Sequence, residues 1–176
     1  MPPCRVIAPS HRETGVGLIE ILISLVVIAI GLLGLAALQG KAQHAEMESY
    51  QRSQALILLQ DMAARLRANR AGSAGYITDH ADCSNTSSRA GQDLCEWSQA
   101  LAGAGEIMNG SHVGAMMGGQ GCITGGGNDF VITVAWRGLA EMTRSNSNPC
   151  GETTIANPNL RRTVSIPVRF FIPDTH

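Results

Sequence analysis

The sequence has 176 residues and no proline between Pro9 and Pro149. A proline inside a helix removes a hydrogen bond and clashes with the preceding turn, so nothing in this stretch forbids one uninterrupted helix. The spacing of apolar residues predicts a helix from about Val16 to about Asn69. Such a helix would be roughly 80 Å long, about twice the thickness of a membrane. Its second half should therefore project into the compartment beyond the membrane.

The sequence also lacks the residue patterns of most catalytic and ligand-binding sites. The net charge of −1 argues against broad electrostatic binding to nucleic acid. No CxxC spacing supports a zinc site, and the glycine-rich stretch 118–127 lacks the Lys-Ser/Thr of a phosphate-binding loop. No trio of serine, histidine and acid stands out. We therefore predict no enzymatic activity, no metal and no cofactor, and a turn-rich connection at 118–127.

What the sequence does contain is an apolar run from Ile21 to Leu38, in which Ser24 is the only polar residue. About 20 apolar residues are enough to span a bilayer as a helix. The run is longer than the apolar core of a signal peptide, and no cleavage site follows it, so we predict a membrane anchor. Because the leader 1–15 carries Arg5 and Arg12, the leader should stay in the cytoplasm and the bulk of the chain should be exported.

A carboxylate, Glu20, lies at the start of this apolar run. An ionised group at the bilayer centre costs about 2.5–3.5 kcal/mol, so such a residue is retained when it has a partner. Cleavage after Gly15 would create an α-amino group on Val16, one helical turn before Glu20. Amines of this kind are largely cationic at neutral pH. In a bundle of such helices, the Glu20 carboxylate of one subunit could pair with the Val16 amine of a neighbour.

A simpler interpretation of Glu20 is a carboxylate bound by the first backbone amides of the helix. That interpretation explains neither Gly15 nor the leader. Two glycines in the apolar run, Gly31 and Gly34, also have two interpretations. They could form a weak point that lets the helix unwind or approach a neighbour closely, or they could reflect the higher frequency of glycine in membrane helices.

The cysteines indicate the compartment of the exported part. Cys4 precedes the apolar run, and four cysteines follow it: Cys83, Cys95, Cys122 and Cys150. Cysteines on the far side of a membrane-targeting segment indicate an oxidising compartment and two disulfides, although unpaired buried thiols are an alternative. Among three possible connectivities we favour neighbour pairing, Cys83–Cys95 and Cys122–Cys150, with about 3 kcal/mol of stabilisation from each.

Beyond the long helix, the sequence predicts one short helix and two strands. The capping pattern Asp93–Glu96 predicts a helix that ends at Gly103, with Trp97 in the core. Alternating apolar residues predict strands at 130–137 and 164–172, and Pro167 places the second strand at a sheet edge. The predicted fold class is α+β, a long N-terminal helix packed against a small antiparallel sheet. We expect the long helix to contact the sheet through an apolar stripe that runs from Met47 to Leu66.

The pattern of Gly15, an apolar helix, and Glu20 as the fifth residue after the cut resembles the class III signal of type IV pilins. The resemblance is dense from Gly15 to Arg70 and patchy afterwards, and Val16 departs from the more usual phenylalanine or methionine. Several further segments are similar to the minor pilin PilV family, also called type IV pilus modification proteins: 30–36, 50–55, 65–70, 96–97 and 134–137.

The resemblance implies that a prepilin peptidase cuts between Gly15 and Val16 and methylates the Val16 amine. The product would be a single-pass inner-membrane protein, surrounded by lipid, with its C-terminal domain in the periplasm. It would join other major and minor pilins through its N-terminal helix, in priming or capping a pilus that drives twitching motility. Two alternatives remain open: a pseudopilin of a type II secretion system and, more remotely, a membrane-tethered periplasmic enzyme.

These expectations divide the chain into four segments. Residues 1–15 form the leader, and residues 16–40 form the transmembrane and assembly helix. Residues 41–70 form the exported half of that helix, and residues 71–176 form a disulfide-bonded globular domain.

Overall fold

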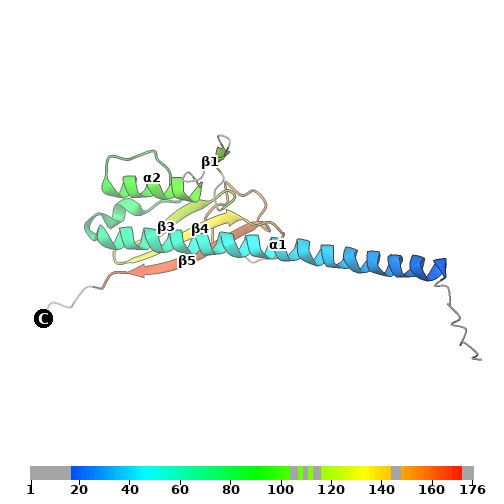
Figure 1. The fold of residues 1–176 in the computed structure, drawn as a ribbon. Coiled ribbons are helices and arrows are strands. Elements are labelled where there is room, and N and C mark those ends of the chain that lie inside the picture. Colours follow the sequence, from blue (N-terminus) through cyan, green and yellow to red (C-terminus); the bar gives the residue numbers. More distant parts are fainter. Residues whose placement is uncertain (1–16, 104–106, 109–110, 113–115, 144–147, 172–176) are drawn as a thin grey trace, which may run out of the picture. The chain divides into compact units, whose positions relative to one another are not determined.

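The computed structural model describes residues 17–103, 107–108, 111–112, 116–143 and 148–171. The chain divides into two compact units, unit 1 (Met1–Gln43) and unit 2 (His44–His176). The predicted α+β class is confirmed, since the chain has a long N-terminal apolar helix and a small antiparallel sheet of three strands (Figure 1).

The first helix, α1, spans Leu18–Ala68. It ends close to the predicted residue and is followed by a 3-10 helix, η1, at Arg70–Tyr76. In unit 1 every described residue is exposed, including the whole apolar run. By length and composition α1 is able to cross a membrane. The predicted first helical residue, Val16, lies outside the described residues.

In unit 2 one face of α1 packs on the sheet, but not along the predicted stripe. Met47 and Tyr50 are 49% and 47% exposed. The buried face begins one turn later and includes small and polar residues among the apolar ones: Gln51, Ala55, Leu59, Met62, Ala63 and Leu66. The N-terminal end of the predicted stripe was wrong. The stripe was predicted from apolar residues alone, whereas the buried face of the helix also includes a glutamine and two alanines.

The sheet consists of β3 (Gln120–Gly126), β4 (Asp129–Arg137) and β5 (Arg161–Arg169), in the order β3-β4-β5. Four alternate residues of β4 are in the core, as predicted: Phe130, Ile132, Val134 and Trp136. Thr133 and Ala135, which lie between them, are also buried. Pro167 is in β5, which is an edge strand as predicted. The predicted end of this strand, Ile172, lies outside the described residues. Two further short strands, β1 (Ile107–Met108) and β2 (Ser111–His112), pair with each other.

Strand β3 lies in the stretch that the sequence predicts to be a connection, so that prediction was wrong. A Cβ at Gly121 would lie 2.2 Å from a ring carbon of Trp97, and Trp97 is fully buried. Glycine is therefore needed where the strand passes under the indole ring. Local composition could not reveal this, because the reason for the glycine is a tertiary contact.

The second helix, α2 (Arg89–Leu101), begins four residues before the predicted cap. Ser88 is its N-cap, and the Ser88 hydroxyl accepts a hydrogen bond from the Gly91 N–H. Asp93 is inside the helix and buried, so the predicted capping role was wrong. The prediction that Trp97 belongs to the core is confirmed, and its Nε1–H donates to the carbonyl of Leu58 at 3.0 Å.

Two disulfides crosslink unit 2. Cys83–Cys95 joins the loop before α2 to that helix, with a Cα–Cα distance of 4.3 Å. Cys122–Cys150 joins β3 to the loop after β4, with a Cα–Cα distance of 5.9 Å. These are the two pairs that the sequence analysis favours.

Candidate functional site

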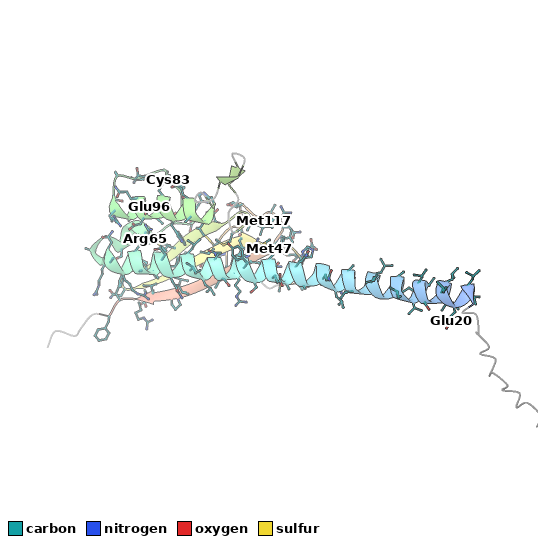
Figure 2. The ribbon with its side chains drawn as sticks, viewed as in Figure 1. Glu20, Met47, Arg65, Cys83, Glu96 and Met117 are labelled. Carbon is teal, nitrogen blue, oxygen red and sulfur yellow. A yellow bond between two sulfur atoms is a disulfide. The ribbon has the colours of Figure 1, made fainter. Side chains whose placement is uncertain are left out.

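Glu20 lies in the first turn of α1, on an exposed part of the helix (Figure 2). Its backbone N–H donates to the Gly17 carbonyl at 2.8 Å, and its own carbonyl accepts from the Ser24 hydroxyl at 2.7 Å. Among the residues that the structure describes, no group donates to the Glu20 carboxylate. The carboxylate is therefore available to a partner. The predicted cleavage site, Gly15 and Val16, lies outside the described residues.

The helix that carries Glu20 is apolar on all sides from Ile21 to Leu38, and none of this surface is buried within unit 1. A helix that is apolar all round needs lipid or other helices around it. Gly31 and Gly34 are on this surface, and a Cβ at either position would meet no atom within 4 Å. Both glycines leave space for another helix, and the two interpretations of them remain open.

In unit 2, α1 is fixed to the sheet by a partly buried ion pair. The Arg162 guanidinium donates to both carboxylate oxygens of Glu48, from Nη2 at 3.0 Å and from Nε at 3.2 Å. The backbone N–H of Leu139 donates to the same carboxylate at 2.9 Å. Burial raises the pKa of Glu48, but these hydrogen bonds outweigh it and leave the pKa below the ordinary value of 4.5.

Because its pKa is lowered by folding, Glu48 should stabilise the fold above about pH 4.5 and lose that effect as the pH falls through its folded pKa. We expect Glu48→Gln to lower the free energy of unfolding at pH 7 by roughly 1–3 kcal/mol. The difference between the variant and the wild type should shrink below pH 4.5. Urea unfolding of the detergent-solubilised chain at several pH values measures both effects, and a difference that does not change with pH contradicts the assignment.

A second polar cluster joins the end of α1 to α2. Arg65 pairs with Asp61 at 2.9 Å and with Asp93 at 3.1 Å, and it also pairs with Glu96 on α2 (Figure 2). The Tyr76 hydroxyl donates to the other oxygen of Asp93. Burial and the Asp93 carboxylate raise the pKa of Tyr76 to about 12. Every charge in this cluster has a partner, so the buried Asp93 carboxylate avoids the cost of an unpaired buried charge.

A cavity of about 620 Å³ lies between the 79–80 segment and the loop that contains Cys150. Its lining includes the polar side chains of Asp79, His80, Asn148 and Glu152, and the Cys122–Cys150 disulfide also lines it. Within the described ranges, no group of three or more His, Cys, Asp or Glu side chains could hold a metal ion.

Neither polar cluster could be predicted from the sequence. Glu48 and Arg162 are 114 residues apart in the sequence. Neither has a local motif, so only the fold brings them together. Asp93 was noticed, but as a helix cap, because its true partner Tyr76 is in a segment for which we predicted no structure.

Comparison with known protein families gives two matches to parts of this chain. Residues 10–36 match the prokaryotic N-terminal methylation motif. Residues 37–103 match the Tt1218-like family, described as type IV pilin Tt1218. Comparisons with curated proteins and with solved structures gave no significant match. The first match ends at residue 36 and the second begins at residue 37, so together they include α1 and α2.

Proposed function

We propose that this chain is a minor pilin of the PilV kind, because residues 37–103 match a type IV pilin family and residues 10–36 match the N-terminal methylation motif. A prepilin peptidase would cut between Gly15 and Val16 and methylate the new amine. Residues 16–40 would then anchor the subunit in the inner membrane and later join other pilins. Residues 41–70 and the domain 71–176 would be in the periplasm and, after assembly, on the pilus.

The observation that carries this proposal is the coincidence of three features at one place. The methylation motif ends inside α1, Glu20 is in the first turn of that helix, and the apolar surface after Glu20 is uncovered. A bundle of such helices would bury the carboxylate, and a buried charge is tolerated only with a partner. The Val16 amine of a neighbouring subunit, made by the same cleavage, would supply a partner at about the depth of Glu20 in the bundle.

The exported unit has the features of a structural subunit. Two disulfides crosslink it, and the Glu48–Arg162 pair and the Arg65 cluster fix α1 to the sheet and to α2. Such a unit is rigid, which suits a component of a filament that must withstand shear. Pilins are structural proteins, and the cavity beside His80 adds no reason to assign catalysis.

Incorporation into pili tests the proposal. Pili sheared from cells should contain the chain, detected by an antibody against unit 2, and deletion of its gene should impair twitching while protein secretion stays normal. Normal twitching with lost secretion would identify a pseudopilin instead. Absence from sheared pili, together with both functions intact, would contradict a role in the filament.

A further inference from the structure

The apolar run from Ile21 to Leu38 contains one polar side chain, that of Ser24. Ser24 is exposed on α1, and its hydroxyl donates to the backbone carbonyl of Glu20 at 2.7 Å. A serine hydroxyl has one hydrogen and two acceptor lone pairs, so this bond uses its only hydrogen. No donor among the described residues contacts the Ser24 oxygen. Its lone pairs are therefore available to a partner.

Ser24 and Glu20 lie on the same side of α1. Residues four apart in an α-helix are neighbours on one face, with Cβ atoms about 5–6 Å apart. Over the described residues 17–38, all other side chains are apolar and exposed. Glu20 and Ser24, which we call the polar pair, are thus an isolated polar spot near the start of α1, where Figure 2 labels Glu20.

The chemistry of the polar pair selects a cationic donor. A bundle of apolar helices that covers this face removes water from one carboxylate and one hydroxyl oxygen. Both groups offer only acceptors, because the hydrogen of Ser24 is already bound to the Glu20 carbonyl. A protonated amine with two N–H bonds supplies two hydrogens and the charge opposite to that of Glu20. The amine proposed for mature Val16 has this form when it is protonated and carries one methyl group.

One nitrogen is able to reach both members of the polar pair. Two N–H bonds of a tetrahedral nitrogen, each with a donor–acceptor distance of about 2.8 Å, place their acceptors about 4.6 Å apart. This separation is close to the distance between side chains four residues apart, and the long, exposed Glu20 side chain can adjust to it. Without Ser24, the second N–H would face apolar groups and lose the hydrogen bond that it makes with water.

We propose that Ser24 is a second residue of the assembly site, whose oxygen accepts the second N–H of the Val16 amine of a neighbouring pilin. The proposal rests on the proposed function, because such an amine exists only after cleavage. Glu20 supplies the opposite charge, and Ser24 fixes the orientation of the amine against α1. The neighbour is any processed pilin with an amine of this kind, so the contact requires no second copy of this chain.

Competitive incorporation into pili tests the role of Ser24. Each variant is expressed beside a tagged wild-type chain, and mass spectrometry compares their ratio in sheared pili with the ratio of processed protein in membranes. Ser24→Ala should lower the relative incorporation about tenfold, as expected for one lost hydrogen bond to a charged group. Ser24→Thr keeps the hydroxyl, so its incorporation should stay within about twofold of the wild type.

A relocated hydroxyl provides the matched control. The double variant Ser24→Ala/Ala29→Ser has the composition of the wild type, but its hydroxyl is five residues later and about 140° around the helix. Membrane insertion and the polarity of the span are thereby preserved, whereas the polar pair is not. We expect incorporation as low as that of Ser24→Ala alone. Restored incorporation would show that the position of the hydroxyl is unimportant, which overturns the proposal.

Dependence on Glu20 separates this role from a purely structural one. The bond from Ser24 to the helix backbone could itself bend α1, and an effect of helix shape would persist without the carboxylate. Binding of the amine requires both members of the pair. Ser24→Ala should therefore cause less than about a twofold further loss when it is added to Glu20→Ala. A full tenfold further loss contradicts the proposal.

The two proposals can fail separately. If Glu20→Ala lowers incorporation but Ser24→Ala enters pili at the wild-type ratio, the role of Ser24 is wrong and the proposed function stands. If the chain keeps its leader and is absent from pili, the proposed function is wrong, and Ser24 has no amine to bind.

Discussion

Replacing Glu20 by alanine is expected to leave cleavage after Gly15 intact and to remove the chain from sheared pili. The variant would leave the Val16 amine of a neighbour without its partner inside an apolar bundle. Removing one member of a buried pair costs roughly 3–5 kcal/mol, which lowers incorporation by about a hundredfold or more. Quantitative immunoblotting of sheared pili and of membranes, at equal levels of processed protein, measures this loss.

Glu46 offers a matched control for this experiment. It is an exposed glutamate on the same helix, within unit 2 and beyond the apolar run. Glu46→Ala removes the same charge from the chain but no buried partner, so this variant should enter pili at the wild-type level. Equal incorporation of Glu20→Ala and Glu46→Ala would show that the carboxylate has no special role in assembly.

Gly121→Ala is expected to lower the stability of unit 2 strongly. The added Cβ would lie 2.2 Å from one ring atom of Trp97 and 2.5 Å from another. The ring is not free to move away, because it is buried and its Nε1–H is bound to the Leu58 carbonyl. We expect the free energy of unfolding to fall by roughly 1–3 kcal/mol or more, as overpacked cores do.

The same strand contains the control for this substitution. A Cβ at Gly126 would meet no atom within 4 Å, so Gly126→Ala should change the free energy of unfolding by less than about 0.5 kcal/mol. Urea unfolding of the detergent-solubilised chains, followed by tryptophan fluorescence, compares the two variants. Equal stability of both would mean that the strand does not pass under Trp97 as described.

The helices and strands that the sequence predicted correctly are those with a local signature. The absence of proline and the run of apolar residues defined α1, and alternation of apolar residues defined β4. Pro167 placed β5 at an edge because proline cannot donate to a strand on that side. Each of these inferences needs only neighbouring residues, so the rest of the fold could not obscure it.

The features that the sequence missed depend on partners far along the chain. Gly121 is in a strand because Trp97 covers it, and Asp93 is buried because Tyr76 and Arg65 bind it. Met47 was assigned to the buried face of α1 because it is apolar, yet that face uses Gln51. Local composition cannot separate a glycine that permits close packing from a glycine in a turn.

The candidate site has residues with and without a local signature. The sequence context alone predicts a role for Glu20, because a carboxylate beside an apolar run demands an explanation, and this role stays a prediction. The Glu48–Arg162 pair has no such context, since charged residues are ordinary in the exposed part of a helix and at the start of a strand. Only the register of β4 and β5 against α1 reveals that pair.

The central claim is that a cleavage after Gly15 makes the amine that Glu20 binds. Mass spectrometry of the N-terminal peptide, from the chain purified out of membranes, tests it most directly. The account predicts a chain that begins at Val16 with one methyl group on its amine, and an uncut precursor when Gly15 is replaced by leucine. A native chain that still begins at Met1, or that is cut at another bond, would contradict it.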